Sequence, residues 1–116
     1  MRCTLGLTNW QTQLRKGLLD IVVLNLLERG PCHGYDMVRT LKQINGLRLR
    51  EGNIYPILAR LETDALVSSF SKPSRDGPPR RCFRLTASGR NALAEMNAHW
   101  EQIVESIEEV RKGGRK

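Results

Sequence analysis

Residues 51–86 read EGNIYPILARLETDALVSSFSKPSRDGPPRRCFRLT, and the spacing of the apolar residues changes partway through this stretch. Across residues 51–64 they recur every three or four positions, which predicts an α-helix. The predicted core face consists of Ile54, Ile57, Leu58 and Leu61. From residue 66 onward the pattern alternates, and we predict β-strands at residues 66–71 and 81–86. The stretch therefore predicts a helix followed by a β-hairpin.

Two details of this stretch give more specific expectations. Pro56 falls inside the predicted helix, where it removes a backbone hydrogen bond and crowds the carbonyl four residues earlier. That earlier residue is Gly52, whose backbone adjusts readily, so we expect a bend near the helix start and not an end. Residues 72–80 are rich in Pro and Gly and too long for a two-residue turn, so we expect a protruding hairpin loop.

Two more helices are predicted before this stretch. Residues 9–29 carry a wide apolar face, so we expect much of this helix to be buried and Gly30-Pro31 to end it. The residues at helical spacing are Trp10, Leu14, Leu18, Ile21, Val22 and Leu26. A second helix is predicted over residues 34–44, with His33 before it as a cap or turn residue and Asn45-Gly46 after it as a turn. Its predicted buried side consists of Tyr35, Met37, Val38, Leu41 and Ile44.

One long helix is predicted over residues 86–112, and its apolar residues follow heptad spacing. At ~1.5 Å per residue it is about 40 Å long and must project beyond so small a domain, so a second copy is the simplest partner for its seam. The predicted dimer interface consists of Leu93, Met96, Trp100, Ile103, Ile107 and Val110. We expect residues 1–8 and 113–116 to be flexible.

Basic charge is concentrated away from this long helix. The 116 residues carry a net charge of +7, divided into +8 on residues 1–90 and −1 on residues 91–116. Residues 72–90 hold six basic side chains and a single acidic one, Asp76. A basic hairpin beside a helix with polar outward residues favours contact with the phosphates or the minor groove of duplex DNA.

The order of the elements then predicts the fold class. Three helices followed by a β-hairpin form a winged helix-turn-helix, in which the third helix enters the major groove. We predict a mainly α fold with a small β-hairpin, a winged helix-turn-helix DNA-binding domain at residues 9–86 and a C-terminal dimerisation helix at residues 87–112. A two-fold dimer of this kind would bind a near-palindromic duplex.

Other functional classes lack the residues they need. Catalytic Ser-His-Asp, Cys-His or paired-carboxylate sets and phosphate-binding loops are absent at recognisable spacings, so we predict no enzyme activity. We expect no metal and no cofactor, because the chain has no CxxC pair and its two histidines, His33 and His99, lie far apart. The longest apolar stretch, residues 18–27, is too short for a bilayer, and unpaired cysteines fit a cytoplasmic protein with no membrane partner.

Four segments together resemble the PadR family of bacterial transcriptional regulators, over about residues 11–112. They are Gln13-Leu14-Arg15-Lys16-Gly17, His33-Gly34-Tyr35, residues 51–62 with Tyr55-Pro56 and Arg60-Leu61-Glu62, and residues 80–89 with Leu85-Thr86-Ala87-Ser88-Gly89. The single C-terminal helix is similar to that of the short PadR subfamily. The resemblance implies a homodimeric repressor of an operator near its own gene or a neighbouring operon, weakened in several members by an aromatic or drug-like effector. Arg50 departs from the pattern, because related sequences often have a Ser or Asn cap there.

The candidate DNA contacts lie on the third helix, the wing and the first helix. Asn and Arg side chains can bond adenine and guanine, and basic side chains bind phosphate. The candidates are Lys16, Asn53, Tyr55, Arg60, Arg75, Arg80 and Arg81. The alternatives are that Tyr55 packs in the core, that Asn53 caps its helix, and that Lys16 is merely solvated.

Trp100 has two interpretations. It either fills a seam position in the dimer or, as the resemblance to the short subfamily implies, flanks a pore with its symmetry mate. A planar aromatic molecule could stack between the two indoles. The remaining candidate ligand contacts are Leu14, Leu18, Ile21, Met96 and Ile103. The alternatives to an effector-controlled repressor are the same repressor without an effector, and an adaptor that binds another protein through the C-terminal helix.

Overall fold

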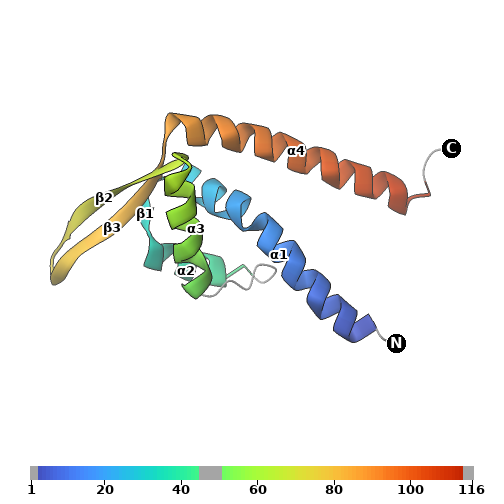
Figure 1. The fold of residues 1–116 in the computed structure, drawn as a ribbon, viewed down its shortest axis with the longest axis horizontal. Coiled ribbons are helices and arrows are strands. Elements are labelled where there is room, and N and C mark those ends of the chain that lie inside the picture. The colour runs from blue at the N-terminus through green and yellow to red at the C-terminus, as the bar shows by residue number, and fades with distance from the viewer. Residues whose placement is uncertain (1–2, 45–50, 114–116) are drawn as a thin grey trace.

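The computed structural model of the chain describes residues 3–44 and 51–113, with side chains for residues 7–44 and 54–113. The elements are α1 (Cys3–Glu28), β1 (Cys32–His33), α2 (Gly34–Lys42), α3 (Glu51–Thr63), β2 (Val67–Ser74), β3 (Gly77–Leu85) and α4 (Ala87–Arg111). In Figure 1, α2, α3 and the sheet gather in a head, from which α1 and α4 extend as two diverging helices. We call residues 18–44 and 51–97 the head and residues 3–17 and 98–111 the arms. The predicted fold class, mainly helical with a winged hairpin and a long last helix, is confirmed.

The helices agree with the expectations in number and differ at their ends. α1 begins at Cys3 and not at residue 9, and α2 ends at Lys42 and not at residue 44. α3 continues through Pro56 to Thr63, as predicted. The turn expected at Asn45-Gly46 and the departure at Arg50 lie outside the described residues. No helix in the described part of the chain is long and apolar enough to cross a membrane.

The sheet corrects two expectations. It has three antiparallel strands in the order β1-β3-β2, and the two residues of β1 pair with Cys82 and Phe83. β1 was not predicted, because a strand of two residues shows no alternation in the sequence. Residues 72–80 are not a long loop, since β2 and β3 stay paired out to Ser74 and Gly77 around a two-residue turn. Pro73 fits because β2 is an edge strand with an irregularity between Lys72 and Ser74. Pro78 and Pro79 fit because β1 covers β3 only at Cys82 and Phe83.

The core lies entirely in the head. The predicted core residues of α3 are confirmed, and they pack with α1, α2, the sheet and the first turns of α4. The largest fully buried side chains are Leu24, Met37, Ile54, Leu58, Leu61, Leu93, Val23 and Val67. The expectation that α1 is largely buried is wrong for its first half, where Trp10 and Leu14 are 58% and 41% exposed. Tyr35 and Ile44, predicted on the buried side of the second helix, are also exposed.

The start of α4 is fixed to the end of α3 by short contacts. The Thr86 hydroxyl accepts a hydrogen bond from the Gly89 backbone N–H (2.9 Å) and so caps α4, while it donates to the Ala65 carbonyl (2.7 Å). Gly89 lies so close to this connection that a Cβ there would be 2.0 Å from the Leu66 carbonyl oxygen. The direction in which α4 leaves the head is therefore determined by backbone contact.

Candidate nucleic-acid interface

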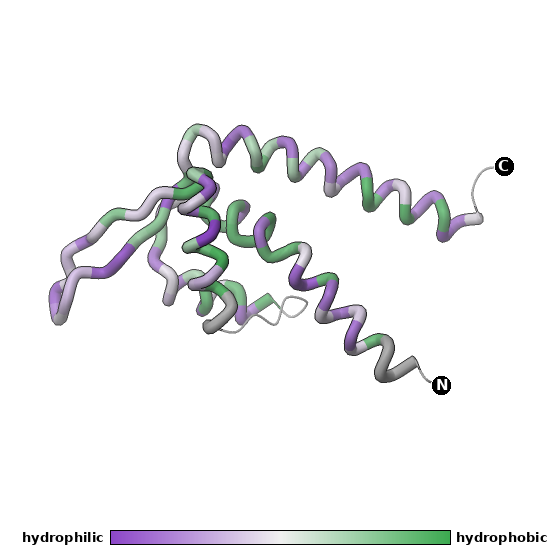
Figure 2. Tube along the Cα trace, viewed as in Figure 1, coloured by the Kyte–Doolittle hydropathy of each residue, from purple (hydrophilic) through white to green (hydrophobic). Residues whose placement is uncertain are grey.

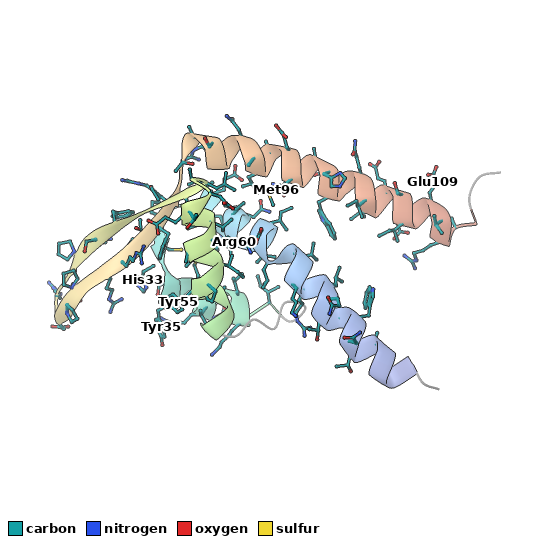
Figure 3. The ribbon with its side chains drawn as sticks, in the orientation of Figure 1. His33, Tyr35, Tyr55, Arg60, Met96 and Glu109 are labelled. Carbon is teal, nitrogen blue, oxygen red and sulfur yellow. The ribbon has the colours of Figure 1, made fainter. Side chains whose placement is uncertain are left out.

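A cleft of about 520 Å³ opens where the N-terminus of α2, the outer side of α3 and strand β3 meet. It is lined by His33, Gly34, Tyr35, Tyr55, Ala59, Glu62, Arg80, Arg81 and Phe83. In Figure 3, His33, Tyr35 and Tyr55 gather at this junction beside α3. The cleft thus brings together three of the predicted DNA contacts, Tyr55 from α3 and Arg80 and Arg81 from the wing.

Tyr55 lies across the N-terminus of α2. A Cβ on Gly34 would be 2.5 Å from Tyr55 Cε1, so only glycine at position 34 lets this ring take its place. Tyr55 is 42% exposed, which argues against the alternative that it packs in the core. Tyr35 stands next to it, stacked on the His33 ring at 6.5 Å between centroids, with the Arg39 guanidinium 5.8 Å above its own ring.

His33 caps α2, as predicted, and also approaches the wing. Its Nδ1 accepts from the Asp36 backbone N–H (3.4 Å), and its Nε2 lies 3.0 Å from the Asp36 carboxylate and 2.9 Å from Arg80 Nη1. A neutral imidazole has one N–H and one acceptor nitrogen. The capping bond uses Nδ1 as the acceptor and places the proton on Nε2, which then donates to Asp36. In that tautomer His33 offers Arg80 no acceptor.

Arg81 has a different environment, which we call the Glu62 clamp and define as Glu62, Ser69 and Arg81. Arg81 Nη2 donates to Glu62 Oε1 at 2.6 Å, and the Ser69 hydroxyl donates to Glu62 Oε2 at 2.7 Å. Arg81 also lies 3.3 Å from the Ser69 hydroxyl and 5.2 Å over the Phe83 ring. The clamp ties α3 to both strands of the wing, so Arg81 has internal partners that its neighbour Arg80 lacks.

The other predicted DNA contacts lie outside the cleft. Arg60 forms an ion pair with Asp20 and so connects α3 to α1. Arg75 is exposed in the turn between β2 and β3, and Lys16 is exposed on α1. Asn53 belongs to α3, but its side chain is not among the described ones, so neither the base-contact nor the capping interpretation is tested.

Sequence reasoning missed Gly34, Tyr35 and Glu62 as members of this site. Gly34 and Tyr35 stand in the segment His33-Gly34-Tyr35, but only the packing against Tyr55 gives them a role. Glu62 has no helical partner at hydrogen-bonding spacing, because its partners come from the hairpin that folds over it. No local pattern signals such a contact.

A second candidate surface runs along the arms. Large apolar side chains are exposed on both of them, and Figure 2 shows hydrophobic and hydrophilic residues alternating along the two helices. They are Leu7, Trp10 and Leu14 on α1 and Trp100, Ile103, Val104, Ile107 and Val110 on α4. Where the arms join the head, Asn25 and Asn97 exchange two amide hydrogen bonds of 3.0 and 2.9 Å. This pair links α1 to α4.

The residues predicted for the dimer seam and the ligand pore divide between head and arms. Trp100, Ile103, Ile107, Val110 and Leu14 are exposed, whereas Leu18, Ile21 and Met96 are partly buried. Leu93 is fully buried in the core of its own chain, so this one seam residue has no surface to offer a second copy. The seam that remains starts at Met96.

The thiols and histidines do not form a metal site in the described part of the chain, where no group of three His, Cys, Asp or Glu side chains is close enough to hold an ion. Cys82 is buried and Cys32 is half-buried. Burial, together with the nearby Asp36 carboxylate, raises the pKa of the Cys32 thiol to about 11. This thiol is therefore protonated and unreactive near neutral pH.

Comparison with known proteins places these features in a family. Residues 23–95 match the family described as "Transcriptional regulator PadR-like family". A transcriptional regulator of Mycobacterium tuberculosis is 30% identical over 95 residues, which are 82% of this chain and 87% of that protein. A PadR-like transcription factor from Bacteroides fragilis has a crystal structure that is 35% identical, covers 88% of this chain and 98% of its own, and superposes with a TM-score of 0.74. The crystal structure of a PadR family transcriptional regulator from Eggerthella lenta is 28% identical, covers 95% of this chain and 96% of its own, and superposes with a TM-score of 0.82.

Proposed function

Because the chain belongs to the PadR-like family and is a transcriptional regulator rather than an enzyme, we propose that it is a sequence-specific repressor that binds duplex DNA as a homodimer in the cytoplasm. The single observation that carries this proposal is the cleft between α3 and the basic wing, which gathers Tyr55, Arg80 and Arg81 on one face of the head. A helix and a hairpin arranged side by side match the two grooves of a winged-helix complex.

The proposed DNA contacts have different roles. Asn53 and Tyr55 on α3 are the proposed contacts to bases in the major groove, while Arg75 and Arg80 on the wing bind phosphate or enter the minor groove. Lys16 adds a phosphate contact from α1. Arg60 and Arg81 act mainly through their partners Asp20 and Glu62, which hold α3 in place relative to α1 and the wing.

The proposed dimer uses the exposed apolar surface of the arms. An exposed apolar stripe of this length on two helices of one chain is typical of an association surface. Two copies would carry two heads related by a two-fold axis, and the operator would be near-palindromic.

A planar aromatic molecule is the proposed effector, held between Trp100 and its symmetry mate. Leu14, Leu18, Ile21, Met96 and Ile103 would complete the walls, which suits an apolar ligand. Binding there would weaken the affinity for DNA. The alternatives remain a repressor without an effector and an adaptor that uses the arms to bind another protein.

The test of DNA binding is selection of bound duplexes from a random pool with the full-length protein. We expect a near-palindromic consensus and a steep fall of log K with log salt concentration. The protein's mass in solution is measured in parallel, because a stable monomer that selects no duplex would contradict the repressor and favour the adaptor. Asn53→Ala should relax preference at particular base pairs, whereas Arg75→Ala should weaken all sequences alike.

The effector is tested separately by fluorescence. Trp10→Phe leaves Trp100 as the only indole of the chain, so its emission reports on the proposed pore. Planar aromatic compounds should change this emission and weaken DNA binding together. If a broad set of such compounds changes neither quantity, the repressor works without this kind of effector.

A further inference from the structure

The cleft lies at the boundary between the two elements that the proposed function assigns to two different grooves. Tyr55, Ala59 and Glu62 bring α3 to one wall, and Arg80, Arg81 and Phe83 bring the base of the wing to another. When α3 occupies a major groove and the hairpin reaches the adjacent minor groove, the sugar-phosphate strand that separates those grooves must cross between them. The cleft lies between the same two elements.

We propose that this cleft is a binding site for a single phosphodiester unit of that strand, with Arg80 as its cationic ligand and Tyr35 and Tyr55 as its walls. The inference rests on the proposed DNA binding and deepens it. It names one phosphate per half-site as the point where α2, α3 and the wing act together.

The charges inside the cleft leave Arg80 as its available cation. Glu62 is paired with Arg81 and accepts from Ser69, so neither its negative charge nor the positive charge of Arg81 stands alone. The Asp36 carboxylate is 3.0 Å from the His33 ring and helps hold the tautomer that caps α2. Arg80 then lies at the wall without a carboxylate partner among the described residues, and a guanidinium is well suited to bind a phosphate oxygen.

The floor of the cleft adds two further features that suit an anion. It is formed at the first residues of α2, where backbone N–H groups and the helix dipole favour negative charge. Gly34 lets the Tyr55 ring lie against this end of α2, because a side chain there would collide with the ring. The two tyrosine rings provide apolar walls for the sugar.

The test uses the full-length protein and a duplex from the selection. Each phosphate of one half-site is replaced in turn by an uncharged methylphosphonate, and Kd is measured for the wild type and for Arg80→Ala. We expect one phosphate, or two adjacent ones, at which neutralisation weakens wild-type binding about tenfold and Arg80→Ala binding hardly at all. Tyr55→Phe should reduce the effect at the same phosphate.

Two controls make the result specific. Arg111→Ala removes one positive charge from α4, where Arg111 pairs with Glu108. In this variant, neutralising the same phosphate should still weaken DNA binding about as much as in the wild type. Arg80→Lys should keep the salt dependence of the wild type and part of its sensitivity to neutralisation. Circular dichroism and Tm confirm that each variant is folded.

The outcomes distinguish failure of the phosphodiester site from failure of the proposed DNA binding. If Arg80→Ala stays as sensitive as the wild type at every phosphate, the phosphodiester site is wrong and the proposed DNA binding stands. If the protein selects no duplex at all, the proposed function fails and this site fails with it.

Discussion

In the head, Leu24, Leu58 and Leu93 expose at most 1% of their surface, whereas in the arms Trp10 and Val110 expose 58% and 79%. Both regions consist of helices with apolar residues at helical spacing. The difference is that α2, α3 and the sheet close around the second half of α1 and the first turns of α4 and leave the rest of both helices uncovered. An amphipathic pattern thus predicts that the apolar face of a helix will be covered, but it does not predict whether the same chain or another one covers it.

The largest effect of a substitution is expected in the head. Leu58→Ala leaves a cavity where the side chain is 1% exposed and should lower the free energy of unfolding by about 2–5 kcal/mol. Urea unfolding followed by circular dichroism, at one fixed protein concentration, measures this loss. The matched control is Glu101→Ala on the exposed side of α4, which should change the value by no more than about 0.5 kcal/mol. Equal losses in the two variants would contradict the division into head and arms.

The arms should respond in association and not in folding. Ile107 is half exposed in the single chain, so Ile107→Glu is tolerated there but would bury an unpaired charge in the proposed dimer. We expect the Kd of the dimer to rise about 100-fold, with unchanged helix content. Sedimentation equilibrium gives the mass, and Ile107→Leu serves as the control that keeps the dimer. An unchanged mass for Ile107→Glu would remove α4 from the interface.

A smaller effect is expected where α3 meets the wing. Arg81→Glu breaks the Glu62 clamp, and because such a pair is largely exposed we expect about fivefold weaker DNA binding. Adding Glu62→Arg restores the pair with reversed charges and should recover most of the affinity. If the double variant binds no better than Arg81→Glu, then Arg81 contacts DNA directly and the clamp is not its role.

The smallest effect concerns the thiol at the edge of the sheet. The pKa of Cys32 is raised to about 11, so its reactive thiolate forms only at high pH. In a Cys3→Ser, Cys82→Ser background, the rate of alkylation by iodoacetamide should keep rising tenfold per pH unit beyond pH 9. In urea the rate should level off near pH 9. A plateau near pH 9 in the folded protein would show that the head does not bury this thiol.

The sequence predicted the parts of the fold that depend on local spacing. The core positions Ile54, Ile57, Leu58 and Leu61 lie on one face of a helix, and the spacing is sufficient to find them. The pairing of Ser74 with Gly77 could not be found in this way, since the prolines nearby are tolerated only because each has an open strand edge beside it. The exposure of Trp10 escaped prediction for the same kind of reason: it depends on where the other elements end.

The basic residues of the candidate site could be predicted from their residue types. Which of them are paired with other side chains could only be seen in the structure. Arg80 and Arg81 are adjacent in the sequence and equally basic, yet the first lies beside His33 and the second is held by Glu62. Both side chains line the same cleft, but the acid that meets Arg81 comes from α3, an element distant in the sequence. Charge counting alone treats the two residues as equivalent.

The close contact of Gly89 with the Leu66 carbonyl holds the start of α4 against the head, so a small change at this contact would tilt the whole helix. α4 has 25 residues, which at ~1.5 Å per residue give a helix about 37 Å long. Tilting a helix of this length by about 5° moves its far end by about 3 Å, close to the ~3.4 Å rise of one DNA base pair. In the proposed dimer the two heads are connected through their α4 helices, so the direction that Gly89 gives to α4 affects the distance between the heads. We expect Gly89→Ala to change the preferred spacing between the two operator half-sites and to leave the preferred sequence of each half-site unchanged.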